Sequence, residues 1–343
     1  MLETTWFLLW TLLWAVYFIL DGFDFGMGTL MPFLARNSEE KRLIYNSAGP
    51  FWDGNEVWLI TAGGVTFAAF PKAYAVMFSA LYAPLLILLF ALIFRAVSFE
   101  FRSKLDSSAW HSLWDVFQFL GNLVPGLLLG VAFANLFMGI PIDSDGVYHG
   151  SLHGLLNPYG LAGGVFFVLM FCLHGALWLS IKTDNGMQEK AIAAATLLWP
   201  VVLAMALIFL ALTAMYTNVY ANYQANPVLV IIPIVAVAAL LTLRFLLRGG
   251  VLLGAWIASA VFIAGVTFFG VLGMYPGLIL SSLDPAYSVT IFNGGSSSPL
   301  TLKIMLGVVL CLVPLVIIYQ IWTYVTFSHK VTPGTLANDE HSY

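Results

Sequence analysis

Long apolar stretches alternate with short polar segments along the whole chain. Cutting the sequence at its charged, polar and proline- or glycine-rich clusters leaves nine apolar segments, which with their flanks approach the ~20 residues that a helix needs to cross the hydrocarbon layer. They lie near residues 6–34, 51–70, 73–99, 115–138, 160–181, 193–216, 226–246, 251–272 and 301–327. The pattern predicts an all-α polytopic membrane protein of nine transmembrane helices, forming one integral membrane domain over residues 1–343.

Positive charges divide the connecting loops into two sets. Lys72 and Lys303 are the only cations after an even-numbered segment. The other eleven of the thirteen follow odd-numbered segments: Arg36, Lys41, Arg42, Arg95, Arg102, Lys104, Lys182, Lys190, Arg244, Arg248 and Lys330. Because lysine and arginine collect in cytoplasmic loops, the predicted N-terminus is outside and the C-terminus inside. Eight or ten spans would scramble this alternation.

Composition excludes several other classes of protein. The chain is 61% hydrophobic and 9% charged, against roughly 25% charged for a soluble domain. The net charge of −4 and its scattered cations give no reason to invoke nucleic acid. Cys172 and Cys311 lie singly in apolar stretches, so neither a disulfide framework nor a metal motif is indicated. Small residues such as Gly26 permit close helix approach.

Four acidic residues fall inside or at the ends of the first two segments. Asp21 and Asp24 are three residues apart and share a helix face, roughly 22 and 27 Å below Trp6. Asp53 and Glu56 share a face at the start of the second segment. A carboxylate in a span costs about 2.5–3.5 kcal/mol, so such groups face the protein interior and usually mark ion or proton paths.

Some polar residues have a plainer interpretation. Asp53 is equally a candidate N-cap, since aspartate is favoured there. Asp115 is expected as an N-cap or first-turn acid of the fourth span. Arg95 with its neighbours Glu100 and Arg102 is typical of a solvated or ion-paired helix end. Lone amides, Asn122 and Asn135, are typical hydrogen-bond partners between helices.

Histidine limits what the chain can bind. Of its six histidines, only His174 is plainly within a span. A haem held by two axial histidines needs more than this, so the chain by itself is a poor haem carrier. His174 is more typical of a hydrogen-bonded packing residue than of a proton relay.

Several long motifs are distinctive. They are Asp-Gly-Phe-Asp-Phe-Gly-Met-Gly (21–28), Gly-Pro-Phe-Trp-Asp-Gly-Asn-Glu-Val-Trp-Leu-Ile (49–60), Phe-Ala-Ala-Phe-Pro-Lys-Ala-Tyr-Ala (67–75), Phe-Glu-Phe-Arg-Ser-Lys (99–104), Gly-Val-Ala-Phe-Ala-Asn (130–135), Leu-Leu-Asn-Pro-Tyr-Gly-Leu (155–161) and Met-Tyr-Pro (274–276). With these motifs the sequence closely resembles subunit II of cytochrome bd-type quinol oxidases, from the first span to the last.

The resemblance implies a heterodimer of two similar nine-span subunits in the bacterial or archaeal cell (inner) membrane. Each subunit would have two four-helix bundles and one peripheral helix, sometimes joined by a small single-span subunit. Subunit I would carry the quinol-oxidation loop and three haems, two of b-type and one of d- or b-type. The complex would oxidise quinol and reduce O₂ to water.

The family's motif acids map to Asp21, Asp24 and Asp53, with Trp52 beside the last. The resemblance implies that these residues conduct cytoplasmic protons toward the oxygen-reducing site. Glu56 is an accessory, because its position holds Glu or Gln in the family.

Two other classes remain open from the residues alone. A secondary transporter or cation channel would also have intramembrane acids, although those lie near the midplane on broken helices. A structural scaffold for subunit I would use the same acids to anchor or hydrate the interface.

Overall fold

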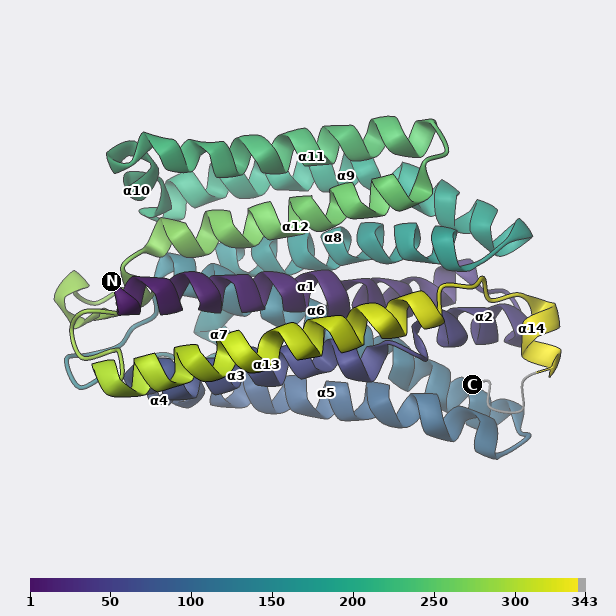
Figure 1. Cartoon of the computed structure of the whole chain (residues 1–343), viewed down its shortest axis with the longest axis horizontal. Helices are drawn as coiled ribbons and strands as arrows, with labels where there is room; N and C mark the ends of the chain where they lie inside the picture. Colours follow the sequence, from purple (N-terminus) through teal and green to yellow (C-terminus); the bar gives the residue numbers. More distant parts are fainter. Residues whose placement is uncertain (339–343) are drawn as a thin grey trace.

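The computed structural model describes residues 1–338, and long helices lie side by side along one axis (Figure 1). The long helices are α1 (Leu2–Leu34), α3 (Trp52–Ala69), α5 (Tyr82–Phe101), α6 (Ser108–Met138), α8 (Pro158–Lys182), α9 (Asn185–Tyr216), α11 (Ile231–Arg248), α12 (Leu252–Met274) and α13 (Pro299–Thr326). Short helices connect them: α2 (Ser38–Ala48), α4 (Pro71–Ala80), α7 (Leu152–Leu155), α10 (Val219–Ala225) and α14 (Pro333–Asn338), with 3₁₀ turns at Arg102–Lys104, Pro227–Val230 and Pro285–Tyr287.

Within residues 1–338, eight helices are long and apolar enough to cross a membrane, and α3 is the long helix not among them. All eight coincide with predicted apolar segments, which confirms a polytopic helical membrane protein. The 18 residues of α3 include Asp53, Asn55 and Glu56 near its start, and these lower its mean hydropathy. A ninth crossing by α3 stays a prediction.

The predicted segment 73–99 is wrong as a single helix. It is divided at Leu81 into α4 and α5. Pro84, the third residue of α5, has no backbone N–H, and its ring would clash with the Ala80 carbonyl in a continuous helix. The chain therefore turns at Leu81 and restarts, so that α5 is the membrane-length part.

Helix α1 packs against α3, α6, α8 and α12, which places it in the interior (Figure 1). Its closest approach is to α8. A Cβ atom at Gly26 would lie 1.8 Å from the Phe171 carbonyl oxygen, and one at Gly175 would lie 2.4 Å from the Met27 nitrogen. Glycine at both positions lets the two backbones touch.

The end of the bundle that holds α2 and α14 also holds most of the loop cations; we call it the basic end (right in Figure 1). Lys190 donates to Glu40 at 2.6 Å, and the Arg36 backbone N–H donates to the same carboxylate at 2.7 Å. These two hydrogen bonds hold the pKa of Glu40 below its usual range. Lys182 donates to the carbonyls of Phe327 and His329. The chain after α13 is thereby held against α8.

The opposite end carries two longer loops that we predict to be irregular, residues 139–159 and 274–300. They contain the short helix α7, one small antiparallel ribbon of β1 (Gly277–Ile279) with β2 (Val289–Thr290), the 3₁₀ turn Pro285–Tyr287 and two isolated bridges. Trp6 donates to the Leu302 carbonyl at 3.0 Å, which ties the start of α13 to α1.

The close contact of α1 with α8 gives a stability prediction. Gly26→Ala should lower the melting temperature of the purified protein, because overpacking of this kind costs about 1–3 kcal/mol. Gly307→Ala is the matched control, since no heavy atom lies within 4 Å of a Cβ there. It should melt at or slightly above the wild-type temperature, as alanine favours a helix by about 1 kcal/mol over glycine. Equal melting of both variants would contradict the packing argument.

Candidate functional site

One arginine and two carboxyl groups form an ion-pair cluster inside the bundle. Arg95 on α5 donates through Nη1 and Nη2 to both oxygens of Asp21 on α1, at 2.6 and 3.2 Å. Its Nη2 also donates to Glu56 of α3 at 2.9 Å. The side chains of Arg95 and Asp21 are fully buried, while that of Glu56 is 23% exposed. The cluster thus joins three helices and opens at Glu56.

Asp24 lies one turn from Asp21 and has different partners. One of its carboxyl oxygens accepts from the Asn55 amide at 2.7 Å, and the other has no hydrogen-bond partner among residues 1–338. The Asn55 oxygen in turn accepts from the Tyr324 hydroxyl at 2.8 Å. A polar chain therefore runs from α13 through α3 to Asp24.

The charges of this group do not balance. Three carboxyl groups, Asp21, Asp24 and Glu56, lie near the single guanidinium of Arg95, whose printed bonds go to Asp21 and Glu56. A buried carboxylate without a cation is costly, and it is favoured in its neutral, protonated form. Asp24 is therefore the carboxyl group best suited to take up and release a proton.

Asp53 and Trp52 lie outside the ion-pair cluster. Asp53 is exposed on the first turn of α3, and among the described residues no hydrogen bond joins it to the buried acids. Its interpretation as an N-cap is wrong, because the cap position is Phe51. The Trp52 ring stacks on Phe99 with centroids 5.2 Å apart. Of the four acids predicted to lie together, Asp21, Asp24 and Glu56 do so, whereas Asp53 lies apart from them.

Two sequence interpretations of polar residues near helix ends need correction. The interpretation as a solvated or ion-paired helix end holds for Arg102, which is ion-paired, but not for Arg95. Arg95 lies within α5, buried at the centre of the cluster, and its guanidinium balances acids on other helices. Asp115 is not a first-turn acid, because α6 begins at Ser108. It pairs instead with Lys41 at 2.9 Å and Arg102 at 2.7 Å.

Sequence reasoning missed the partners of Asp24 altogether. Asn55 lies inside the motif that contains Asp53 and Glu56, but its position between two acids did not indicate that its amide binds Asp24. Gln320 and Tyr324, one turn apart on α13, both reach Asn55. The lone glutamine in an otherwise apolar span was a signal that could have indicated this contact.

His174 is engaged as a packing residue, as predicted. Its Nδ1 lies 2.5 Å from the Ser259 hydroxyl and its Nε2 lies 3.0 Å from the Ile19 carbonyl oxygen. The ring also stacks on Trp256 at 5.1 Å. With both nitrogens occupied, this residue does not fit the role of an axial haem ligand.

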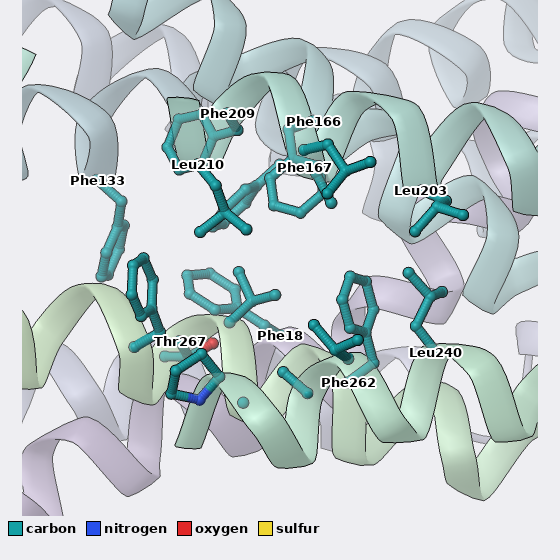
Figure 2. A pocket seen from close by; sticks show the side chains of 18 of the residues that line it. Phe18, Phe133, Phe166, Phe167, Leu203, Phe209, Leu210, Leu240, Phe262 and Thr267 are labelled. Atoms are coloured by element: carbon teal, nitrogen blue, oxygen red, sulfur yellow. The ribbon is translucent and has the colours of Figure 1, made fainter. Parts of the chain in front are cut away.

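An apolar pocket, whose lining contains none of the acids, lies between α1, α6, α8, α9, α11 and α12. Figure 2 shows its lining, in which aromatic side chains such as Phe18, Phe166 and Phe262 surround the space. Thr267 contributes the one hydroxyl of the lining, and it donates to the Ile263 carbonyl. The pocket has no ionisable lining residue and so offers no acid–base chemistry.

Comparisons with known proteins point to one family. The model of the family described as cytochrome bd terminal oxidase subunit II matches residues 2–327. Cytochrome bd ubiquinol oxidase subunit 2 of Bacillus subtilis (strain 168) is 38% identical over 333 residues, covering 96% of this chain and 97% of the relative. Cytochrome bd-I ubiquinol oxidase subunit 2 of Escherichia coli (strain K12) is 34% identical over 378 residues, covering 99% and 98%.

A solved structure agrees in fold. The bd oxidase from Geobacillus thermodenitrificans contains a chain that matches with a TM-score of 0.75 and 19% identity. The match covers 95% of this chain and 98% of that chain. At this identity the likeness concerns the fold alone.

Loss of the guanidinium gives the prediction for the cluster. Arg95→Gln should reduce the yield and melting temperature of the purified protein, since breaking a buried ion pair costs about 3–5 kcal/mol. Adding Asp21→Asn should recover part of the loss, because a neutral amide needs no cation. The control is Lys303→Gln, which removes an exposed cation from α13 and should have no effect. Failure of Asp21→Asn to recover any stability would mean that charge balance is not the reason for the pair.

Proposed function

Because the chain belongs to the cytochrome bd terminal oxidase subunit II family, it is a component of a bd-type quinol oxidase, and we propose that it contributes a proton path through the carboxyl cluster. The relay consists of Asp21, Asp24 and Asp53, and Trp52 and Glu56 shape its mouth. The complex oxidises quinol and reduces O₂ to water, and this chain supports that reaction without performing the redox step itself.

The observation that carries the proposal is the position of Asp24. It is 3% exposed, accepts one hydrogen bond from a neutral amide, and forms no ion pair with any of residues 1–338. Asp21, one turn away, is neutralised by Arg95. A proton on Asp24 can therefore come and go without disturbing the ion pair that holds the helices together.

The mouth of the relay lies on the outer face of α3. Glu56 is partly exposed there, and Asp53 is exposed one turn earlier on the same helix face. In the assembled complex we place oxidase subunit I against this face, so that the partner covers the acids and receives the protons. A small single-span subunit is a further expected partner.

The proposed topology has nine spans, with α3 as the ninth crossing because a partner shields its polar start. Helices α1, α3, α5 and α6 form one four-helix bundle, and α8, α9, α11 and α12 form the other, with α13 peripheral. Loop cations put the basic end in the cytoplasm, the N-terminus outside and the C-terminus inside. The setting is the bacterial or archaeal cell (inner) membrane, as one multi-pass domain.

The haems belong with subunit I in this proposal, two of b-type and one of d- or b-type. They supply the electron transfer to O₂. Within residues 1–338, no group of histidine, cysteine or acidic side chains could hold a metal ion, and both nitrogens of His174 are engaged. The role proposed for the residues of this chain in proton transfer and assembly rests on the carboxyl cluster and on the family.

Asp24→Asn tests the relay. The amide is close to isosteric, can still accept from Asn55, and cannot carry a proton, so the complex should assemble while O₂ consumption falls at least about 10-fold. Turnover is measured per haem in the purified complex, with visible spectra to count the haems. Asp184→Asn, outside the cluster and at the same end of the bundle, is the control and should keep full turnover.

Full turnover by an assembled, haem-replete Asp24→Asn variant would refute the relay and leave the scaffold function. Proton-uptake kinetics on the same variant separate these two alternatives directly. The transporter or channel hypothesis is not supported, since the chain matches an oxidase subunit family over nearly its whole length.

A further inference from the structure

Three polar side chains follow one face of α6 inward from the basic end. Asp115, Gln118 and Asn122 are spaced at i, i+3 and i+7, which places them on one helix face. All three are buried, with exposed fractions of 8%, 4% and 1%. A buried polar stripe on a membrane-length helix is costly unless its groups are satisfied or used.

The stripe faces the helix that carries the relay. A Cβ atom at Gly28 of α1 would lie 2.0 Å from the Asn122 amide nitrogen, so Asn122 sits directly over this glycine. A Cβ atom at Gly121 would lie 2.8 Å from the backbone nitrogen of Arg95. Asn122 is therefore at the level where α6 meets both α1 and the arginine of the cluster.

The order of groups along the axis is continuous. Asp24 is four residues from Gly28 and about 6 Å deeper in the bundle. Asp115 is seven residues from Asn122 and about 10 Å nearer the basic end. Since α1 runs toward the basic end and α6 away from it, Asp115, Gln118, Asn122 and Asp24 follow one another inward.

The outer end of the stripe opens into a polar pocket of about 700 Å³. Asp115 lines it together with residues of α2, the 3₁₀ turn and the start of α6. The lining includes Lys41, Arg102 and His111. Solvent from the basic end thus reaches Asp115, the outermost residue of the stripe.

The inner part of the stripe has unused acceptors. Among residues 1–338, no hydrogen-bond partner exists for Gln118 Oε1, Asn122 Oδ1 or Asp24 Oδ1. Arg95 Nε is also without one. Asn122 Nδ2 donates to the Gln118 carbonyl at 2.6 Å, which leaves its oxygen for another donor. Buried polar groups of this kind are usually satisfied by water, which makes about 2–4 hydrogen bonds in such a place.

We propose that Asp115, Gln118 and Asn122 line a water route that carries protons from the pocket at the basic end to Asp24. A proton enters from solvent at the Asp115 level, moves along water held by the two amides, and is taken up by the Asp24 carboxylate. The amides hold and orient water and do not themselves titrate. The function of this route rests on the proposed relay, because the relay is what the route would supply with protons. The existence of the route can be tested without any measurement of turnover.

The first experiment asks whether water reaches the stripe. Gln118→Cys and Asn122→Cys are made in the whole complex with Cys172→Ala and Cys311→Ala, in membrane vesicles whose basic end faces the medium. Aqueous Ag⁺, a small ion that binds thiols, is added, and protection of each thiol from alkylation after denaturation is measured. Leu120→Cys, on the exposed apolar side of the same helix, is the shielded control, and Ser112→Cys, in the pocket lining, is the open one.

We expect both stripe thiols to be protected by Ag⁺ at a rate near that of Ser112→Cys and well above that of Leu120→Cys. If neither stripe thiol is protected faster than Leu120→Cys, the route is overturned. Should one variant fail to assemble, the other decides the question by the same comparison.

The second experiment asks what the route serves. Gln118→Leu and Asn122→Leu remove the amides, and each should slow O₂ consumption per haem several-fold, whereas Gln188→Leu, a half-buried glutamine off the stripe at the same end, should not. Gln118→Glu, which keeps a polar group, should recover most of the turnover lost in Gln118→Leu. Full turnover by assembled, haem-replete Gln118→Leu and Asn122→Leu complexes would refute the proposal that the route supplies protons for O₂ reduction.

The two hypotheses fail separately. Protected stripe thiols together with full turnover of Asp24→Asn would refute the relay and leave a water route that ends elsewhere. Shielded thiols together with a slow Asp24→Asn variant would refute the route and leave the relay, with its protons arriving by another path.

Discussion

The ion pair of Arg95 with Asp21 is the interaction on which the rest of the site depends. Inside a bilayer-spanning bundle, a carboxylate is tolerated when a cation and hydrogen-bond donors replace the water it has lost. Arg95 supplies both through two parallel hydrogen bonds, and a third bond reaches Glu56. One guanidinium thereby joins α1, α3 and α5, with Arg95 and Asp21 fully buried and Glu56 partly exposed.

The same pair explains why Asp24 differs from its neighbour. Once Arg95 is committed to Asp21 and Glu56, Asp24 has only the neutral amide of Asn55, which is itself held by Tyr324 from α13. Helix α13 thus contributes to the site although Leu302 is its one buried residue. At Gly26 the backbone of α1 touches the backbone of α8, and at Gly28 it lies against the Asn122 side chain of α6, so α1 packs closely on both helices near the acids.

Hydrophobic patterning predicted nine spans, of which eight are helices of membrane length and hydropathy within residues 1–338, and it placed Asp21 and Asp24 on one helix face. Both predictions depend on local properties. A span needs only enough apolar residues in a row, and two acids three residues apart share a face in any helix. The division at Leu81 was not predicted, since a proline within a span can bend a helix or end it, depending on neighbours. Helix α2 was taken for a loop because most of its eleven residues are polar and its short apolar side is buried only through contact with other elements.

By itself, the sequence determined the membrane class, the family and the helix face that carries the acids, because periodicity and motif order survive without knowledge of contacts. Only the tertiary structure decided which acids meet which partners. It moved Arg95 from a predicted helix end to the centre of the cluster, left Asp53 exposed on α3, and brought Asn55 and Tyr324 into the polar chain that ends at Asp24. The physical reason is that side-chain pairing depends on how helices far apart in sequence pack at one depth, and this is set by backbone contact at a few glycines.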